Sequence, residues 1–293
     1  MYIDAIKGSL IAVIIFSIAV WVLPAGNMGS GAEIILTVSS FLFAILSGFF
    51  ISRLNDRYNK IKQTISSEDA TWLTMYKVSA VYGKKFQAEL AKFIEMYYIA
   101  AFEFVGVDYY KHTSKYFLSI YDLLYKYKKY RNETVFGKLY NHMATIEETR
   151  NNTSVHSRES LTTGQWVIII LLACIIILSI FSLRTPDIYY DIITVMLSTI
   201  LVLIILLIRD LKNLRLGGKL MLIESGQEVF ENMGMLRYYN HAILDKGAIN
   251  IPPYVKTYRV GYHKPYEKPK IKVKKNPRYN KELEKKYYAL DYK

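Results

Sequence analysis

Hydroxyl-bearing and aromatic side chains recur at helical spacing along one apolar stretch of the chain. Steps of three and four place the small and hydroxyl-bearing residues on one stripe of a helix, with two phenylalanines beside it. The set is Thr37, Ser40, Ala44 and Ser47, with Phe43 and Phe50 as the flanking rings. In a ring of such helices, hydroxyls can replace part of the water around an ion, and aromatic rings can form an apolar constriction. The pattern therefore predicts the lining of an ion path.

The same stripe has a simpler interpretation, because small residues also let helices pack closely in lipid. For this stripe alone, packing is the stronger interpretation. A second small polar face in the last apolar segment favours the ion path: Thr194, Ser198 and Thr199. No charged residue lies inside any apolar segment, which argues against proton-coupled transport and voltage sensing, since both use ionisable groups within the membrane.

Four apolar segments must position these residues: 8–23, 34–52, 166–183 and 192–208. Each approaches the roughly 20 residues that a helix needs to cross the hydrocarbon core. The charge-free turn 24–32 and the short turn 184–191 join them into two hairpins. We expect an all-α, oligomeric protein with four transmembrane helices. Its expected parts are hairpin 1–52, helical domain 53–165, hairpin 166–208, basic amphipathic segment 209–248 and Lys/Pro/Tyr-rich tail 249–293.

The polar region 53–165 has a helical recurrence of apolar residues. Ser66 and Asp69 fit a capping box, which predicts that a helix begins there. No proline lies between Ala25 and Pro186, so we expect long helices, some continuing out of the membrane without a break. Thr162 or Thr163 is the expected N-cap of the third apolar helix.

Charge distribution predicts the orientation. With four spans, 37 of the 38 lysines and arginines fall on one side, which the positive-inside rule assigns to the cytoplasm. Both termini and the region 53–165 are therefore expected in the cytoplasm, and the protein in the plasma (inner) membrane. The outer turns carry three acidic residues and Arg184. The acidic residues form the expected outer mouth: Glu33, Asp187 and Asp191.

Basic residues follow the second and fourth apolar segments, where anionic lipid headgroups lie. The expected headgroup contacts are Arg53, Arg57, Arg209, Lys212, Arg215 and Lys219. The lysine-rich stretch 268–277 in the tail is expected to be irregular. Its lysines and tyrosines could suggest nucleic acid, but tethering to the membrane places lipid much closer, so no nucleic-acid partner is expected.

Motifs for enzyme chemistry are absent from the sequence: it has no glycine-rich phosphate loop and no His-Glu-x-x-His. We therefore expect no catalytic residue and no cofactor. The histidines are scattered, so no metal site is expected. Glu95, Glu103 and Asp108 could gather a cation, but solvated positions fit them better. Cys174 is the only cysteine, which rules out an intramolecular disulfide bond and favours a small buried apolar role.

Two stretches of the chain carry a family resemblance: GFFISRLNDRYNKIKQTISSEDATWLTMYKVSA and LAKFIEMYYIAAFEF. With the tryptophan that opens the third apolar segment and the element after the fourth, they resemble the bestrophin-like membrane family over most of residues 40–230. The matching residues are Gly48, Phe49, Arg53, Glu68, Ala70, Tyr97, Glu103, Phe104, Trp166, Arg209 to Leu211, and Gly217 with Gly218. The chain departs from the family in having Phe104 where tryptophan is frequent, and Leu-Arg-Leu where a Pro-Phe-like element is common.

The resemblance implies four transmembrane helices around a cytoplasmic helical domain in an oligomer, with ion-channel function. It favours anions, whereas the acidic outer turns would favour cations, and both stay open at this point. The partners implied are the lipid bilayer, further copies of the chain and inorganic ions. The alternative function is a non-conducting membrane anchor or scaffold that presents the helical domain to a partner.

Overall fold

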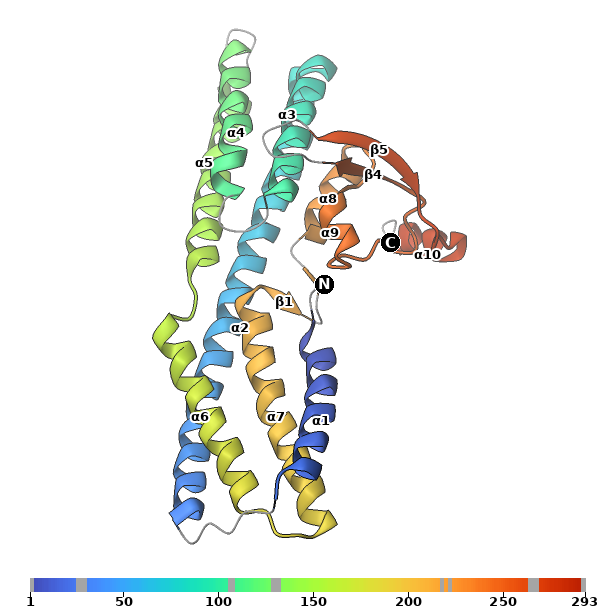
Figure 1. The fold of residues 1–293 in the computed structure, drawn as a ribbon. Coiled ribbons are helices and arrows are strands. Elements are labelled where there is room, and N and C mark those ends of the chain that lie inside the picture. Colours follow the sequence, from blue (N-terminus) through green and yellow to red (C-terminus); the bar gives the residue numbers. More distant parts are fainter. Residues whose placement is uncertain are drawn as a thin grey trace. The chain divides into compact units, whose positions relative to one another are not determined.

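The computed structural model describes residues 3–24, 31–104, 109–127, 133–216, 219–220, 223–262 and 269–290. The chain divides into two compact units (Figure 1). Unit 1 is Met1–Tyr58 with Glu159–Lys219, and unit 2 is Asn59–Arg158 with Leu220–Lys293. The predicted turn 24–32 lies outside the described residues for the most part, and Gly217 and Gly218 lie wholly outside them.

Unit 1 is built from apolar helices: α1 (Ala5–Val22), the first part of α2 (Gly31–Ser79), α6 (Thr163–Ser182) and α7 (Ile188–Lys212). Among the described residues, these four helices are long and apolar enough to cross a membrane. The four predicted segments are thus confirmed as helices. The third begins as expected, because the Thr162 side chain accepts from the Gln165 amide and Gln165 bonds back to Thr162.

Helices α1 and α7 lie side by side in unit 1. Their contact is close at Gly8, where an added Cβ would lie 2.5 Å from the Leu206 Cδ1 atom. Two carboxylates accept hydrogen bonds from backbone amides at the start of α1. Asp4 accepts from the Lys7 amide, and the Asp210 carboxylate on α7 accepts from the Ala5 amide at 3.0 Å. Small side chains and a capped helix end therefore let the two helices approach.

Helix α2 is a single helix of 49 residues, which confirms the prediction of a helix that leaves the apolar segment without a break. The predicted helix start at Ser66 is wrong, because Ser66 and Asp69 lie in the interior of α2. A Ser-x-x-Asp pattern marks an N-cap only where the preceding residues cannot continue the helix. Here the preceding residues, with no glycine or proline after Gly48, continue it.

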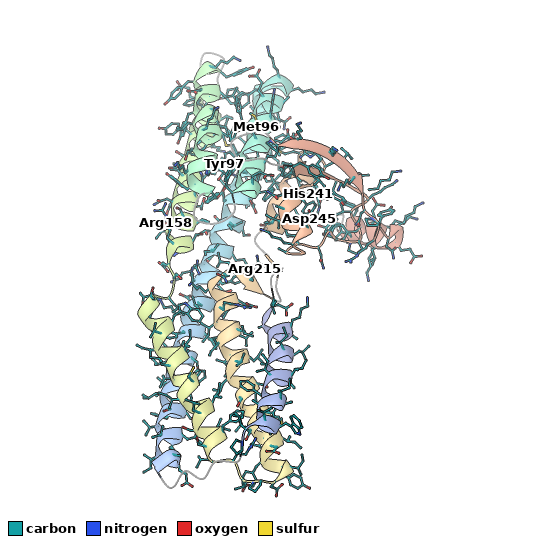
Figure 2. All side chains as sticks on the ribbon, in the orientation of Figure 1. Met96, Tyr97, Arg158, Arg215, His241 and Asp245 are labelled. Atoms are coloured by element: carbon teal, nitrogen blue, oxygen red, sulfur yellow. The ribbon has the colours of Figure 1, made fainter. Side chains whose placement is uncertain are left out.

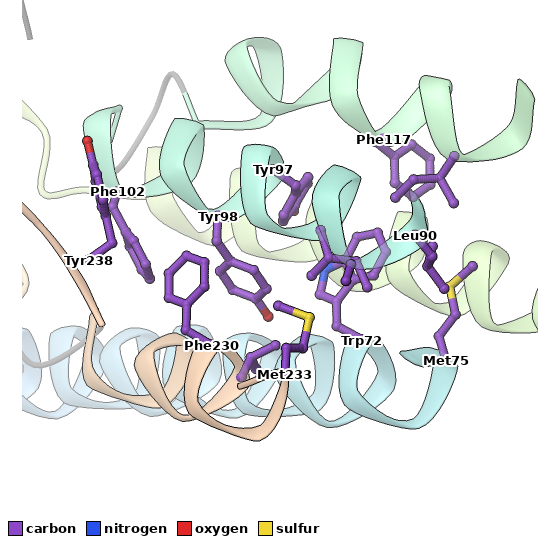
Figure 3. Close-up of a cluster of buried hydrophobic side chains, with 14 of the residues drawn as sticks. Trp72, Met75, Leu90, Tyr97, Tyr98, Phe102, Phe117, Phe230, Met233 and Tyr238 are labelled. Atoms are coloured by element: carbon purple, nitrogen blue, oxygen red, sulfur yellow. The ribbon is translucent and has the colours of Figure 1, made fainter. Parts of the chain in front are cut away.

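The helical part of unit 2 comprises the second half of α2, the 3₁₀ turn η1 (Ala80–Tyr82), α3 (Lys84–Glu103), α4 (Tyr109–Lys126) and α5 (Glu133–Arg158). Its core is rich in aromatic rings (Figure 3). Trp72 of α2 is fully buried, with its ring centre 5.0 Å from that of Tyr97 on α3 and 6.4 Å from that of Phe117 on α4. Aromatic packing therefore joins three helices around Trp72.

The C-terminal part of unit 2 corrects the all-α prediction. After the short strands β1 (Arg215–Leu216) and β2 (Lys219–Leu220), which pair with each other, the elements are α8 (Glu224–Asn232), β3 (Tyr238–Asn240), α9 (His241–Asp245), β4 (Thr257–Tyr262), β5 (Lys270–Lys275) and α10 (Lys281–Leu290). The second sheet has the order β3-β4-β5, with β3 parallel and β5 antiparallel to β4. In the described part of the chain, the protein is mainly helical, with two small sheets.

The predicted irregular stretch 268–277 is also corrected, because its residues 270–275 form strand β5. Lysines alternate there with Ile271 and Val273, and this period of two suits a strand. In the neighbouring strand β4, only glycine fits at position 261. An added Cβ there would lie 1.6 Å from the Tyr238 hydroxyl oxygen. Gly261 thereby lets the Tyr238 side chain cross β4 towards α3.

Candidate functional site

The first part of α2 carries the predicted stripe, and its two phenylalanines point into unit 1 itself. Phe43 and Phe50 are each 4% exposed. They share a buried apolar cluster with residues of the two neighbouring helices: Ile169, Ala173 and Ile176 of α6, and Ile208 and Leu211 of α7. Within the subunit, α6 and α7 cover both rings, and the constriction between copies stays a prediction.

Four of the predicted lining residues surround one hollow of about 310 Å³ between α2, α6 and α7. Its lining consists of Ser40, Phe43, Ala44, Ser47, Gly48, Ile51, Ile176, Leu201 and Ile204. The Ser47 hydroxyl donates to the Ala44 carbonyl at 3.2 Å, so its hydrogen bond is satisfied within the helix. The hollow is apolar apart from the two serines, and no charged side chain lines it.

An adjoining face of α2 stays exposed in the subunit, and it shares Ser40, Ala44 and Gly48 with the lining of that hollow. Thr37, Ala44, Gly48 and Asn55 are exposed, and Ser40 is half-buried beside them. Steps of seven, four and seven residues keep the four exposed positions on one side of the helix. The Thr37 hydroxyl donates to the Glu33 carbonyl at 2.8 Å. The hydroxyl-bearing stripe thus divides, with Ser47 turned inward and Thr37 outward.

The second small polar face does not stay exposed. Thr194 and Ser198 of α7 are buried, and Thr199 donates to the Val195 carbonyl at 2.7 Å. We therefore assign Thr194 and Ser198 to packing inside the subunit, which removes them as support for an ion path. Small side chains at these positions serve close helix approach, as is usual in lipid.

The predicted outer mouth has an internal ion pair. The Arg184 Nε atom lies 3.5 Å from a carboxylate oxygen of Asp191. The same guanidinium is buried and donates to the carbonyls of Val20, in the last turn of α1, and of Leu23, its C-cap. Arg184 therefore compensates the Asp191 charge and forms hydrogen bonds with carbonyls that have no partner within the helix end.

The other two residues of the predicted outer mouth lie at helix starts. Asp187 is the N-cap of α7, where its carboxylate accepts from the Tyr189 amide at 2.8 Å. Glu33 is exposed in the first turn of α2.

The predicted headgroup contacts fall into two groups. Arg53 is exposed, whereas Arg57 is 5% exposed and donates to the Lys212 carbonyl at 2.9 Å. Lys212 lies over the Trp166 ring, 5.4 Å from its centre, and Arg209 donates to the Asp210 carboxylate and the Ile3 carbonyl. Arg57 thus has a partner inside unit 1, and its contact with a headgroup stays a prediction.

The last two predicted headgroup contacts follow α7. Arg215 lies in β1, where its side chain is half-buried. The side chain of Lys219 lies outside the part of the chain that is described. In the basic amphipathic segment expected over residues 209–248, α7 ends at Lys212 and the strand pair β1–β2 follows. Leu214 makes the turn between them with a positive φ of 54°.

Two adjacent buried carboxylates on α2, in unit 2, form a site that the sequence pattern did not single out. Glu68 accepts from the hydroxyl of Tyr97 at 2.5 Å and from that of Tyr109 at 2.9 Å. Asp69 accepts from the Tyr98 hydroxyl at 2.5 Å. The side chains come from α2, α3 and α4, and Tyr97 is labelled in Figure 2 and Figure 3. Three phenols thereby hold two carboxylates inside the helical core.

Burial controls the acidity of these carboxyl groups. It raises the pKa of Glu68 to about 7, against the opposing effect of the Tyr97 hydrogen bond. It raises the pKa of Asp69 to about 6, against hydrogen bonds from Ser225 and Tyr98. The guanidinium of Arg150 on α5 lies over the Tyr97 ring, 5.5 Å from its centre, and its charge also opposes the rise in the Glu68 pKa. The Glu68 carboxyl group therefore changes its protonation state close to neutral pH.

The acidic residues considered for a cation have partners within the protein. Glu95 pairs with Arg259, and Glu103 accepts from the Tyr238 hydroxyl and the Asn240 amide. Asp108 lies outside the described residues. In the described part of the chain, no group of three or more His, Cys, Asp or Glu side chains could hold a metal ion.

Two of the histidines, His241 and His112, have partners within unit 2. His241 and Asp245, labelled in Figure 2, pair on α9 with 3.0 Å between Nδ1 and the carboxylate oxygen. The His112 ring stacks on Phe104 with 3.5 Å between the ring centres. Cys174 of α6 was predicted to be buried, but it is exposed on the surface of the subunit.

The fold and the site define a class of membrane protein, in which four apolar helices form one unit and the second helix continues into a helical, tyrosine-rich unit. The family model described as the bestrophin-like domain matches residues 10–213. The chain belongs to the bestrophin-like family, as the resemblance predicted. Membership supports an ion channel in general.

Solved structures of a bacterial bestrophin homolog from Klebsiella pneumoniae are similar to this chain. Three of its point variants share 11% sequence identity with the chain, with TM-scores of 0.59, 0.60 and 0.58. The alignments cover 78%, 77% and 84% of this chain and 97%, 94% and 99% of the homolog. At this identity the likeness concerns the fold. No curated protein matches the chain.

Proposed function

We propose that the protein is an oligomeric ion channel of the plasma (inner) membrane, with the exposed face of α2 as the wall of the path. The single observation that carries the proposal is this face itself: Thr37, Ala44, Gly48 and Asn55 are exposed on a helix whose other side is covered by α6 and α7. In a ring of copies, small side chains leave room between the helices, and Thr37, Asn55 and the half-buried Ser40 supply polar atoms to a passing ion.

The proposal refines the predicted lining. It keeps Thr37, Ser40 and Ala44 in the wall, and it moves Phe43 and Phe50 into the subunit core, where both are buried. Exposed aromatic bulk is available on the same part of α2 at Phe41, which is 66% exposed. Phe41 precedes Ala44 by three residues and so lies beside the small face. We assign the apolar constriction to Phe41.

Anions are the proposed cargo. With the termini and unit 2 on the cytoplasmic side, 37 of the 38 lysines and arginines lie there, and a basic surface concentrates anions. At the opposite turns, Arg184 compensates Asp191, which reduces the negative charge of the outer mouth. The remaining predicted mouth residues, Glu33 and Asp187, would oppose anion entry from outside.

Flux through liposomes tests the proposal. Purified protein is reconstituted, and chloride efflux is compared for the native chain, Ala44→Trp and Leu178→Trp. Leu178 is the matched control, because it is an exposed apolar residue of α6, away from the proposed wall. We expect Ala44→Trp to reduce efflux at least tenfold by filling the path, and Leu178→Trp to leave efflux unchanged.

Other outcomes contradict the proposal in different ways. Equal loss in both variants would place the path elsewhere. No flux from well-folded native oligomers would favour a membrane anchor or scaffold that presents unit 2 to a partner. A reversal potential in a potassium chloride gradient that follows potassium would overturn the assignment to anions while leaving the channel in place.

A further inference from the structure

Strand β5 forms the edge of the three-stranded sheet in unit 2. It pairs with β4 on one side, and the sheet order β3-β4-β5 leaves its other side without a strand among the described residues. All six residues of β5 are exposed. Figure 1 shows β5 as a long arrow beside β4, followed by α10. The strand is thus accessible in unit 2 along its length.

The register of the sheet shows which backbone groups of β5 point outward. The Asn276 amide donates to the Lys256 carbonyl at 3.0 Å, so this pair is hydrogen-bonded. Bonded pairs recur at every second residue of an antiparallel ladder. The next bonded pairs are therefore Tyr258 with Lys274, Val260 with Lys272, and Tyr262 with Lys270. The N–H and C=O groups of Ile271, Val273 and Lys275 consequently face away from β4, ready to pair with another strand.

Side chains divide by face along the same strand. Lys270, Lys272 and Lys274 share one face, and the amines of Lys272 and Lys274 each lie 5.5 Å from the centre of the Tyr262 ring. Ile271 and Val273 share the other face, where they are 43% and 62% exposed. Lysines alone can protect a sheet edge from pairing. Two exposed β-branched residues on the opposite face do not serve that purpose, because they add apolar surface that pairing would bury.

We propose that β5 is the docking edge for an extended acidic peptide, which adds to the sheet as a further strand. Its acidic side chains would lie on the lysine face, and its alternate apolar side chains on Ile271 and Val273. The charge of the segment supports this partner: residues 249–293 hold 13 lysines and arginines against four aspartates and glutamates. Backbone pairing supplies affinity in this mode of recognition, and alternating side chains supply selectivity.

Peptide binding to the full chain in neutral-lipid nanodiscs tests the proposal. The probe is a short fluorescein-labelled peptide of alternating glutamate and valine, and the comparison peptide has the same composition in two blocks. Fluorescence anisotropy reports binding. We expect the alternating peptide to bind more tightly than the block peptide, because only the former can place acidic and apolar side chains on opposite faces of a strand.

Variants separate charge from backbone pairing. The double variant Lys272→Gln with Lys274→Gln should weaken binding of the alternating peptide about tenfold, since two exposed ion pairs are lost. Its matched control, Lys285→Gln with Lys286→Gln on α10, removes the same charge from exposed positions and should leave binding unchanged. Val273→Pro removes an outward N–H and should abolish binding, while the bonds to β4 remain.

Four results would overturn the proposal. Equal binding of the two peptides, or equal weakening by the two lysine double variants, would reduce the effect to general charge attraction. Failure of the alternating peptide to bind would leave the lysines as protection of the edge. Capture of phosphatidylserine vesicles that is lost on changing Lys272 and Lys274, without peptide binding, would make β5 a membrane contact. If the Val273→Pro variant does not fold, the two lysine double variants and the block peptide still test the proposal.

Discussion

Replacing Glu68 by glutamine should change how the stability of the protein depends on pH. Burial raises the pKa of the native carboxyl group from 4.5 to about 7. The folded protein therefore binds a proton that the unfolded chain has released, over the whole interval between these values. Stability from this group is fully present below pH 4.5 and is lost as the pH rises to about 7.

The size of the effect follows from the same two values. Each unit of pKa corresponds to about 1.4 kcal/mol, so the native protein loses about 3 kcal/mol of unfolding free energy across the interval. Glutamine is neutral at every pH and keeps a carbonyl that can accept from the Tyr97 hydroxyl. The variant should thus be more stable than the native chain above pH 7, and the difference should shrink towards pH 4.5. The buried Asp69 carboxyl, with its pKa raised to about 6, keeps a pH slope of its own in both proteins.

Thermal unfolding of the detergent-solubilised protein, followed by tryptophan fluorescence between pH 4.5 and 8, measures the difference. Trp72 packs against Tyr97 and reports on this core directly. About 3 kcal/mol should appear as a difference in Tm that grows by roughly 6 to 12 °C over the interval. Glu89→Gln is the control, because the Tyr127 hydrogen bond lowers the pKa of that surface carboxyl, which gives the opposite sign. Identical pH slopes for Glu68→Gln and the native protein would refute the reasoning.

Two further substitutions test the packing, one in each unit. Phe43→Ala should destabilise unit 1 by about 3 to 5 kcal/mol, because it leaves a cavity in the cluster shared with α6 and α7, as thermal unfolding would show. A rise in chloride flux without loss of Tm would contradict the buried position of Phe43. Gly261→Ala should lower the Tm and disorder the contact of the sheet with α3, since the added Cβ would overlap the Tyr238 hydroxyl. The Tyr238 Cζ atom would also lie 2.4 Å from that Cβ, so Tyr238→Phe should not restore the Tm. An unchanged Tm for Gly261→Ala would contradict this cause.

Sequence reasoning succeeded where the solvent imposes a simple rule. A bilayer requires an uninterrupted apolar run, and for that reason the four apolar helices could be placed from composition. The continuity of α2 followed from the absence of proline. The direction of Phe43 could not be predicted, because a helical stripe does not show which of its sides the neighbouring helices cover.

Other errors also have physical causes. Asp69 was interpreted as part of a helix start, and Glu68 was given no site of its own, since local spacing gives no sign that three distant tyrosines provide hydrogen bonds. Their one signal was the family pattern that contains Glu68 and Tyr97. Strand β5 was missed because its lysines suggested a solvated, irregular tail, although the alternation with Ile271 and Val273 was visible in the sequence.

The unbroken course of α2 also fixes the helical phase of its buried residues within unit 1. Phe43, Phe50 and Leu54 follow one another at steps of seven and four residues, and all three belong to the cluster shared with α6 and α7. Inserting one residue between Phe43 and Phe50 would turn one ring by about 100° against the other about the helix axis. Only one of the two could then stay in the cluster, so spacing is under constraint in this part of α2 as much as composition.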